Sequence, residues 1–267
     1  MNFIIMGGDA RARYIYEMLL ERGHGAFPLA LEKELPILGP PDYRGCHGVI
    51  LPLPAEREGY LNAPLSGEKH SAAELLAPLR PGTAVFAGMA GESLRQICRE
   101  KGLQLRDYYE REELQVKNAA LTAEGAMELL RPRAGQRVLI SGFGRIGSLL
   151  ALRLLAAGAE VTVAARSALQ RAWAEAVGCA AVDIGNWGGD YDAVVNTVPA
   201  AVFSGEDIAA FPDAMLLELA SAPYGFDFAA ARPLGREIVL APGLPAKYAP
   251  KAAAKAVLDT IFSMLEE

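Results

Sequence analysis

The chain has few of the residues that bind metals or cross-link secreted proteins. Among its 267 residues there are only three cysteines and three histidines. Cys46, Cys98 and Cys179 are odd in number and far apart, a spacing that fits neither a disulfide framework nor a zinc knuckle. No cluster of His, Cys and Asp has the spacing of metal ligands. We therefore expect reduced, mostly buried thiols and no metal.

Long apolar runs and an excess of positive charge are also missing. No run approaches the about 20 apolar residues of a membrane span, and Met1–Met6 is too short for the apolar region of a signal peptide. The net charge is -6 and the basic residues are scattered, so the chain has no region of positive potential that would attract the phosphates of a nucleic acid. We expect a cytoplasmic globular protein that binds neither membranes nor nucleic acid.

What the sequence does contain is a glycine motif between two apolar strands. Val138–Ile140 is followed by Ser141–Gly147, which reads G-x-G-x-x-G from Gly142, then by a leucine-rich helix and a second strand, Val161–Val163. This order is typical of a dinucleotide-binding βαβ unit, in which the pyrophosphate lies at the helix N-terminus. The residues expected to bind it are Gly142, Gly144, Arg145, Ile146 and Gly147.

The end of the second strand indicates which dinucleotide binds. NAD enzymes usually carry Asp or Glu there, which binds the ribose 2′-hydroxyl and repels a 2′-phosphate. This chain instead has Ala164 and Ala165 followed by Arg166 and Ser167, with no carboxylate before Arg171. A guanidinium and a hydroxyl can both donate hydrogen bonds to a phosphate. The pattern predicts NADP as the cofactor; the alternative is that Arg166 is simply solvated.

The first half of the chain has the same alternation of strands and helices. Apolar strands at Phe3–Met6, Gly48–Leu53 and Thr83–Ala87 are separated by stretches with helical periodicity. Such alternation predicts parallel sheets with helices on both faces. We predict an α/β protein of two Rossmann-like, doubly wound parallel-sheet domains with a cleft between them. The expected parts are an N-terminal substrate and catalytic domain (1–115), a connecting helix (116–135), an NADP-binding domain (136–245) and a C-terminal helix packing back on the first domain (246–267). The helical stretches themselves are expected at Arg111–Leu130, which Pro132 stops, and at Lys251–Leu265, which is amphipathic.

Five further segments stand out besides the glycine motif: Gly7–Arg11, Leu51–Pro54, Asn118–Ala126, Val195–Ala200 and Ala241–Pro245. Together with that motif they resemble the A subunits of dipicolinate synthase, the family that completes dipicolinic acid formation in spore-forming bacteria. The resemblance covers nearly the whole chain in order, and its Thr-Ala-Glu-Gly and Pro-Gly-Leu-Pro signatures are more specific than the glycine motif.

This resemblance implies oxidation of dihydrodipicolinate, or its hydrated precursor, to dipicolinate, with hydride passing to NADP. The substrate is then a small dicarboxylate on a branch of the diaminopimelate and lysine pathway, and a second, flavoprotein-like subunit is the expected partner. Because oxidation of a dihydropyridine ring gives an aromatic product, the protein has mainly to orient the ring against the nicotinamide and bind two carboxylates. We also expect a homo-oligomer.

Polar residues at two strand ends of the second domain are candidates for the nicotinamide half of the site. Ligands of open α/β sheets bind at the carboxyl ends of strands, and Glu218–Ser221 ends one strand there. The other strand end either contacts the nicotinamide ribose or is an ordinary proline-terminated strand end. Its residues, the further predicted cofactor contacts, are Asn196, Thr197, Val198 and Pro199.

The substrate candidates lie in the other signatures. At the first strand–helix turn, Gly7 and Gly8 would expose backbone N–H groups to an anion and Arg11 would clamp a carboxylate. Alternatively, Asp9 is the helix N-cap and Arg11 is solvated. Lys247 either neutralises a substrate carboxylate or is a surface lysine. The predicted substrate-binding residues are Gly8, Asp9, Arg11, Ser221 and Lys247.

The predicted catalytic residues are Glu124, Asn118 and Thr122. Asn118 and Thr122 are four residues apart and share a helix face, whereas Glu124 lies on another. Directed at the cleft, Glu124 would be an acid/base group; a capping or inter-domain structural role is the alternative. No histidine follows His70, so the histidine acid/base that D-2-hydroxyacid dehydrogenases carry near or beyond the end of their cofactor domain is missing.

Two other functions stay open. One is a catalytically silent NADP-binding subunit that positions or regulates the flavoprotein-like partner. This hypothesis stays open because the chain has few candidate acid/base residues. The other is a dehydrogenase of another small carboxylic acid.

Overall fold

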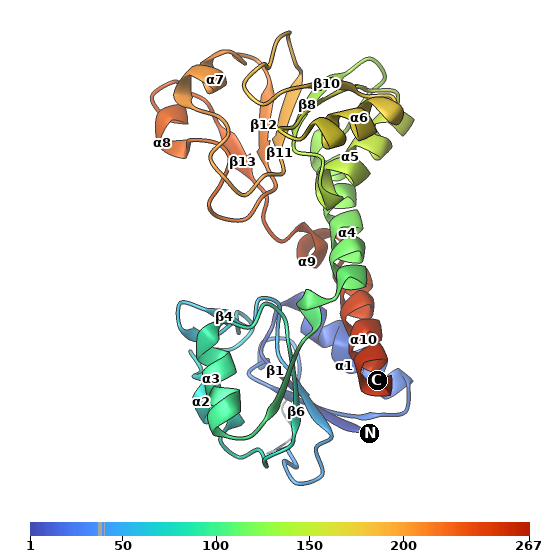
Figure 1. Cartoon of the computed structure of the whole chain (residues 1–267). Helices are drawn as coiled ribbons and strands as arrows, with labels where there is room; N and C mark the ends of the chain where they lie inside the picture. Colours follow the sequence, from blue (N-terminus) through green and yellow to red (C-terminus); the bar gives the residue numbers. More distant parts are fainter. Residues whose placement is uncertain (37–38, 40) are drawn as a thin grey trace. The chain divides into compact units, whose positions relative to one another are not determined.

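The computed structural model describes residues 1–36, 39 and 41–267, and the chain divides into two compact units (Figure 1). Unit 1 consists of Met1–Asn118 with Ala249–Glu267, and unit 2 of Ala119–Tyr248. The strands of the main sheet in each unit pair in parallel, with helices on both faces. The predicted α/β class with doubly wound parallel sheets is confirmed.

The sheet of unit 1 has the strand order β2-β1-β3-β6-β7. In chain order this is 2-1-3-4-5, the doubly wound arrangement whose ligand-binding switch point lies between β1 and β3. A two-stranded hairpin, β4 (Glu56–Arg57) with β5 (Tyr60–Leu61), follows β3 and was not predicted. The main strands are β1 (Asn2–Met6), β2 (Gly25–Leu29), β3 (Gly48–Ile50), β6 (Ala84–Ala87) and β7 (Gln104–Asp107).

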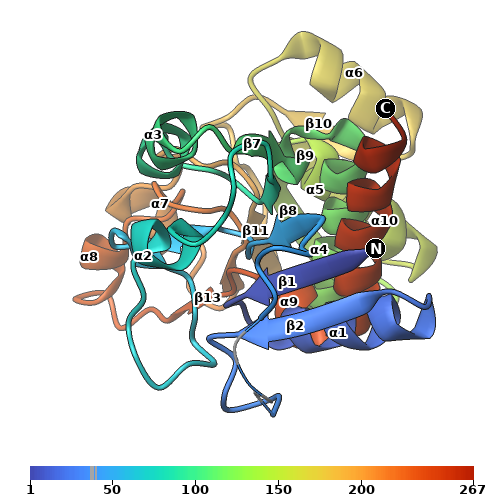
Figure 2. The ribbon, with the colours of Figure 1, turned by 90° about the horizontal axis from the view of Figure 1, so that it is seen from below.

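Alternate residues of these strands bury opposite faces of the sheet in unit 1. Phe3 and Ile5 pack with α1 (Ala10–Glu21) and α10 (Pro250–Glu266), while Ile4 and Met6 pack on the side of α2 (Ala72–Leu76) and α3 (Glu92–Glu100). Figures 1 and 2 both show α10 lying beside α1. A single 3-10 turn, η1 (Tyr108–Glu110), follows β7.

The sheet of unit 2 has the order β10-β9-β8-β11-β12-β13. In chain order this is 3-2-1-4-5-6, the arrangement of dinucleotide-binding Rossmann domains, and its switch point lies between β8 and β11. The strands are β8 (Arg137–Ser141), β9 (Glu160–Ala164), β10 (Ala180–Val182), β11 (Ala193–Asn196), β12 (Met215–Glu218) and β13 (Ile238–Leu240).

Both faces of this second sheet are also covered. One face packs on α4 (Glu112–Leu130, whose second half belongs to unit 2), α5 (Arg145–Ala156) and α6 (Ala168–Ala176). The other face packs against α7 (Gly205–Ala209), α8 (Phe228–Ala231) and an aromatic cluster around Phe203. Burial on both faces explains why strands such as Val138–Ile140 read as continuous apolar runs.

Prolines set three boundaries. The strand expected over Gly48–Leu53 ends at Ile50, because Pro52 and Pro54 have no N–H for the ladder. The helix expected over Arg111–Leu130 spans Glu112–Leu130 and ends before Pro132, as predicted. The helix expected over Lys251–Leu265 lies within α10, and the segment before it forms a separate short helix, α9 (Leu244–Tyr248), because Pro250 forces Ala249 out of the helical conformation.

Within unit 2, two of the sequence signatures touch. A Cβ added to Gly125 of α4 would lie 2.9 Å from Leu244 Cβ and 3.3 Å from Leu244 Cδ1 at the start of α9. Glycine in α4 therefore lets α9 approach the helix backbone. This contact links the Thr-Ala-Glu-Gly segment to the Pro-Gly-Leu-Pro segment by packing rather than by chemistry.

We predict that Gly125→Ala destabilises the protein although alanine is the better helix former. Helix propensity favours alanine by about 1 kcal/mol, but the new methyl group must displace Leu244, and such overpacking costs about 1–3 kcal/mol. The free energy of unfolding, measured by urea denaturation, should fall. Gly67→Ala is the control, because a Cβ there would meet nothing within 4 Å. An unchanged or raised stability of Gly125→Ala would contradict the packing argument.

Candidate functional site

The turn between β8 and α5 is packed so closely that two of its glycines have no space for a side chain. Gly142 has a φ of 91°, and a Cβ there would lie 2.7 Å from Val198 Cγ2 and 2.8 Å from Thr197 Oγ1. A Cβ on Gly147 would lie 2.2 Å from the carbonyl oxygen of Gly142. Both glycines are therefore required by the protein's own packing.

Gly144 is different, because nothing in the protein requires a glycine there. Its φ of -85° suits any residue, and no atom lies within 4 Å of an added Cβ. It is the N-cap of α5, whose first turn has no acidic residue and no capping side chain. An open space before an uncapped helix N-terminus is what a bound pyrophosphate needs, so the residues present fit a dinucleotide.

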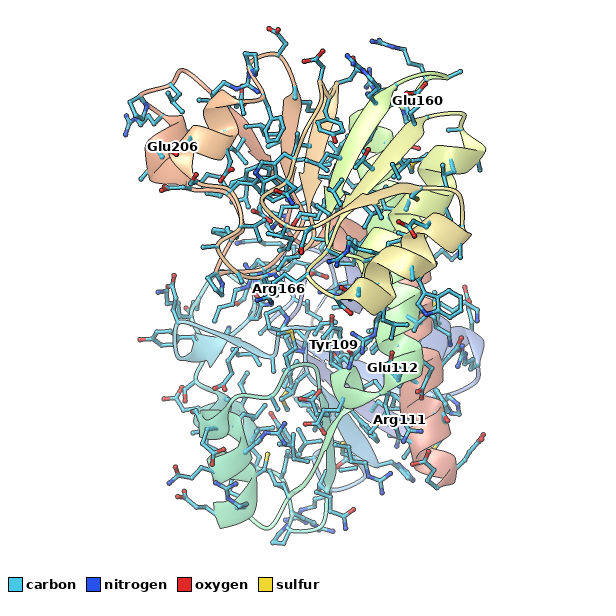
Figure 3. The ribbon with its side chains drawn as sticks, turned by 45° about the horizontal axis from the view of Figure 1, so that its top comes forward. Tyr109, Arg111, Glu112, Glu160, Arg166 and Glu206 are labelled. Carbon is cyan, nitrogen blue, oxygen red and sulfur yellow. The ribbon has the colours of Figure 1, made fainter. Side chains whose placement is uncertain are left out.

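The end of β9 is free of carboxylates, as predicted from its sequence. Ala164 and Ala165 are buried, whereas Arg166 is exposed and its guanidinium bonds to none of the described residues. Figure 3 labels this arginine in the segment between β9 and α6. Ser167 is the N-cap of α6, and its hydroxyl accepts a hydrogen bond from the Gln170 N–H at 3.5 Å.

Sequence reasoning missed a second arginine in this segment. Arg171 Nη1 donates to the carbonyl oxygens of Ala165 at 2.6 Å and Arg166 at 2.9 Å, and it lies 3.2 Å from Asp183 Oδ1. Arg171 therefore fixes the backbone on which Arg166 and Ser167 stand. A contact between a guanidinium and backbone carbonyls has no sequence signature. Arg171 is, however, four residues after Ser167, which places it one helical turn into α6.

The predicted contact of Asn196 with the nicotinamide ribose is corrected by the structure. Asn196 is wholly buried: its Nδ2 donates to Glu218 Oε1 at 2.6 Å and to the Val198 carbonyl at 2.9 Å, and its Oδ1 accepts from the Val198 N–H at 3.1 Å. Thr197 Oγ1 likewise donates to the Ser141 carbonyl at 2.7 Å. Asn196 is thus fully occupied inside the domain. Val198 is half-buried and Pro199 is exposed.

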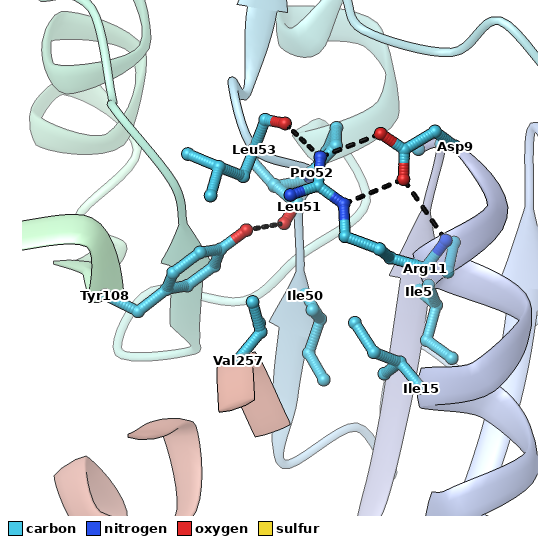
Figure 4. Close-up of a pocket in the computed structure, with 13 residues that line it drawn as sticks. Ile5, Asp9, Arg11, Ile15, Ile50, Leu51, Pro52, Leu53, Tyr108 and Val257 are labelled. Carbon is cyan, nitrogen blue, oxygen red and sulfur yellow. Dashed lines mark hydrogen bonds and ion pairs between the residues drawn. The ribbon is translucent and has the colours of Figure 1, made fainter. Parts of the chain in front are cut away.

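Unit 1 has a small pocket at its own switch point, between the turns that follow β1 and β3 (Figure 4). Its polar rim contains Asp9 and Arg11, and Tyr108 donates a hydrogen bond to the Leu51 carbonyl at 2.9 Å. Burial raises the pKa of Tyr108, so the phenol stays protonated. The cavity volume is about 20 Å³, which is room for about one water molecule and not for a ring.

Arg11 is mostly buried, so the alternative that it is a solvated helix residue is wrong, whereas its contact with a substrate carboxylate stays a prediction. Its side chain is 12% exposed. Nε and Nη2 donate to the two carboxylate oxygens of Asp9 at 2.8 and 2.7 Å, and Nη2 also donates to the Leu53 carbonyl. Burial opposes the charge, but the hydrogen bond and charge of Asp9 outweigh it and raise the pKa of Arg11. Only Nη1 has no acceptor among the described residues (Figure 4).

The two glycines before Arg11 also differ from expectation. The Gly7 N–H donates to the Leu29 carbonyl at 2.8 Å and the Gly8 N–H to the Asn62 carbonyl at 2.9 Å. Neither is available to an anion. Asp9 caps α1 by accepting from the Arg11 N–H at 3.1 Å, so its own carboxylate occupies the position that a bound anion would take.

The remaining predicted residues lie on helices and exposed loops. Glu124 of α4 pairs with Arg153 of α5 at 3.1 Å, and action as an acid or base would require it to leave that partner. Asn118 is half-buried and Thr122 is buried, one turn apart on α4. Ser221 and Lys247 are exposed.

The histidines and thiols are engaged elsewhere. His24 stacks on Phe262 at 5.1 Å, and His70 shares a 2.7 Å hydrogen bond with Ser66. Burial raises the pKa of Cys98 to about 11, so this thiol is protonated and unreactive at neutral pH. Within the part of the chain that the structure describes, no group of three His, Cys, Asp or Glu residues could hold a metal, and no helix is long and apolar enough to cross a membrane.

Two family models match this chain. Residues 2–109 match the N-terminal domain of the dipicolinate synthase A subunit, and residues 103–204 match the NAD binding domain of D-isomer specific 2-hydroxyacid dehydrogenases. The chain is 26% identical over 292 residues to the A subunit of dipicolinate synthase of Bacillus subtilis (strain 168), with 100% of this chain and 96% of that protein covered. The resemblance that the signatures indicated is confirmed.

Solved structures agree over the whole length. The A subunit of dipicolinate synthase from Bacillus halodurans is similar with a TM-score of 0.87 at 25% identity, covering 100% of this chain and 98% of that one. Its counterpart from Bacillus subtilis gives 0.84 at 26% identity, covering 100% and 96%. A transhydrogenase from Sinorhizobium meliloti (TM-score 0.69, 14% identity, 98% and 93% covered) shares the fold alone. The matched dehydrogenase domain supports a nicotinamide dinucleotide as the cofactor and an oxidoreductase nature.

We predict that Gly144→Ala weakens dinucleotide binding without changing stability. The added methyl group meets no protein atom, so the midpoint of urea unfolding should stay the same, while the pyrophosphate loses its close approach to the backbone. The dissociation constant for NADP, measured by calorimetry, should rise by about tenfold, equivalent to about 1.4 kcal/mol. Unchanged affinity would show that the space before α5 holds no phosphate.

Proposed function

We propose that this chain, similar over its whole length to the A subunit of dipicolinate synthase, is the NADP-dependent oxidoreductase subunit that oxidises dihydrodipicolinate, or its hydrated precursor, to dipicolinate. The observation that carries the cofactor choice is the end of β9, where two buried alanines precede the exposed Arg166 and the α6 cap Ser167. A 2′-phosphate can accept from both residues and from the N-terminus of α6.

The proposed reaction removes one hydride and one proton from the dihydropyridine ring. NADP, when bound, supplies the hydride acceptor, so that dihydrodipicolinate and NADP⁺ give dipicolinate, NADPH and a proton. Because the product is aromatic, the chain's residues have to hold the ring and exclude water rather than overcome an unfavourable equilibrium. The glycine turn, Arg166 and Ser167 fix the cofactor end of this arrangement.

We assign recognition of a substrate carboxylate to Arg11 through its Nη1. Asp9 holds the other edge of the guanidinium, so the fork is already oriented before a ligand binds, which lowers the entropy lost on binding. Gly8 shapes this turn. Exposed Ser221 and Lys247 are further candidates for carboxylate contacts, and Asn118, Thr122 and Glu124 remain candidates for catalytic contacts from α4.

A second candidate is a silent NADP-binding subunit whose partner carries the chemistry. It is favoured by the ion pair that occupies Glu124 and by the structural contacts of His24 and His70. We further propose a second, flavoprotein-like subunit as the partner, since the relatives are named as one lettered subunit of a synthase.

One assay separates the enzyme from the silent subunit. The purified chain is mixed with NADP and dihydrodipicolinate, with and without the partner, and the formation of NADPH and dipicolinate is followed by absorbance. Turnover by the chain alone supports the enzyme; turnover only with the partner supports the silent role.

Activity on other small carboxylic acids is the remaining alternative. The same assay with 2-hydroxy and 2-amino acids tests it, and faster NADP reduction by one of them than by dihydrodipicolinate would replace the proposed substrate.

We predict that Arg166→Ala lowers affinity for NADP but not for NAD. Loss of a charge-assisted contact to phosphate costs about 1.5–3 kcal/mol, so the dissociation constant for NADP should rise by about 10- to 100-fold. Calorimetric titration of both dinucleotides into wild type and variant measures the difference. Tighter binding of NAD than of NADP by the wild type would refute the assignment of NADP.

We predict that Arg11→Ala lowers kcat/KM by a factor equivalent to about 2–4 kcal/mol, through loss of a charge-assisted hydrogen bond to the substrate. NADP affinity should stay unchanged, because Arg11 belongs to unit 1 and the glycine turn to unit 2. Arg13→Ala on the same helix, where the arginine is exposed and pairs with Glu17, is the matched control. Normal kinetics of Arg11→Ala in a folded protein would leave Arg11 with a structural role only.

A further inference from the structure

Glu218, at the end of β12, is a carboxylate with no exposed surface. None of the described lysines, arginines or histidines forms an ion pair with it. Its oxygens instead accept four hydrogen bonds. Oε1 accepts from Asn196 Nδ2 at 2.6 Å and the Ala220 N–H at 3.0 Å, and Oε2 accepts from the N–H groups of Gly225 at 2.8 Å and Phe226 at 3.2 Å.

The three backbone donors, Ala220, Gly225 and Phe226, belong to the two ends of one loop. The chain leaves β12, exposes Ser221, and returns to Gly225 and Phe226, which are buried. Both ends of the loop are therefore tied to the same carboxylate. The return is tight, because a Cβ on Gly225 would lie 2.3 Å from Asn196 Nδ2.

Asn196 carries the connection to the glycine turn. It is paired with Glu218 across adjacent strands β11 and β12, and it also bonds to both the N–H and the carbonyl of Val198. Val198 in turn is the residue that a side chain on Gly142 would strike. A continuous set of contacts thus runs from the Glu218 carboxylate to the turn before α5.

The chemistry of this arrangement requires a carboxylate. All four partners are donors, and only an ionised carboxylate offers two oxygens that both accept; glutamine replaces one of them by an NH₂ donor. Burying a charge without a counter-ion is costly unless its hydrogen bonds are complete. An apolar residue would fill the same core position without that cost, but it would leave the loop's N–H groups unsatisfied.

We propose that Glu218 is a positioning residue for the nicotinamide half of the dinucleotide site. This inference rests on the proposed function. The βαβ half that contains β8 and β9 binds the adenosine side, and the half that contains β11 to β13 binds the other mononucleotide at the carboxyl ends of its strands. Glu218 sets the loop that carries Ser221 and, through Asn196, the Thr197–Val198 loop, and both loops follow strands of this second half.

The test compares two ligands on wild type and Glu218→Gln. NADP contains the nicotinamide, whereas 2′-phosphoadenosine 5′-diphosphate contains the adenosine and pyrophosphate alone. We expect Glu218→Gln, which has the same shape, to raise the dissociation constant for NADP by about tenfold or more and to leave that of the fragment within about twofold. Calorimetry gives both constants. Glu160→Gln, an exposed carboxylate at the start of β9 (Figure 3), is the matched control and should change neither.

A second variant reaches the same loop without touching the carboxylate. Gly225→Ala drives a methyl group against Asn196 and should show the same selective loss, so it carries the test if Glu218→Gln fails to fold. Equal weakening of both ligands, or no change in either, would overturn the positioning role while leaving the proposed function intact. A wild type that binds neither ligand would overturn the proposed function, and this inference with it.

Discussion

The close packing of the β8–α5 turn against the loop after β11 is the constraint on which the cofactor domain depends. Gly142 and Gly147 leave no room for a side chain because Thr197, Val198 and the turn's own carbonyl fill that space. The turn therefore has one shape, and the N-terminus of α5 has one position relative to the sheet. Of the three motif glycines only Gly144 faces open space, so the packing of the fold does not require a glycine there.

The same logic of satisfied polar groups explains the other strand ends. In parallel sheets that are buried on both faces, polar side chains gather at the carboxyl edge, where the ladders stop. At this edge of unit 1, Arg11 forms hydrogen bonds with Asp9 and with the Leu53 carbonyl, which connects the turns after β1 and β3. Unit 2 closes its edge with Asn196 and Glu218. In both units internal hydrogen bonds hold side chains at this edge in place.

Local sequence patterns predicted the parts of the fold that local chemistry determines. Glycine spacing, apolar strands and the alanines before Arg166 were sufficient for the β8–α5–β9 unit, because each residue acts on its immediate neighbours. The end of α4 before Pro132 follows from the same kind of rule. The apolar periodicity of Lys251–Leu265 likewise predicts α10, whereas the short helix α9 before it is not predicted.

The sequence pattern does not predict which residues, distant in the chain, form hydrogen bonds with one another. Whether Asn196 points to a ligand or to Glu218 depends on the register of β11 with β12, which the sequence does not state. Likewise, the carbonyl groups that accept from Gly7 and Gly8 come from Leu29 and Asn62, distant in the chain. The residues at these strand ends do lie at the edge of a sheet, but their hydrogen-bond partners could not be predicted from the sequence.

The step that we propose, direct transfer of hydride from the substrate to a dinucleotide held by this chain, can be followed by isotope labelling. The most direct measurement uses dihydrodipicolinate that carries deuterium at the ring carbon that loses hydride, with the chain and NADP, followed by mass spectrometry of the recovered NADPH. We expect NADPH that carries the deuterium, formed by the chain alone. Dipicolinate formed only with a flavoprotein-like partner, with unlabelled NADPH, would contradict it.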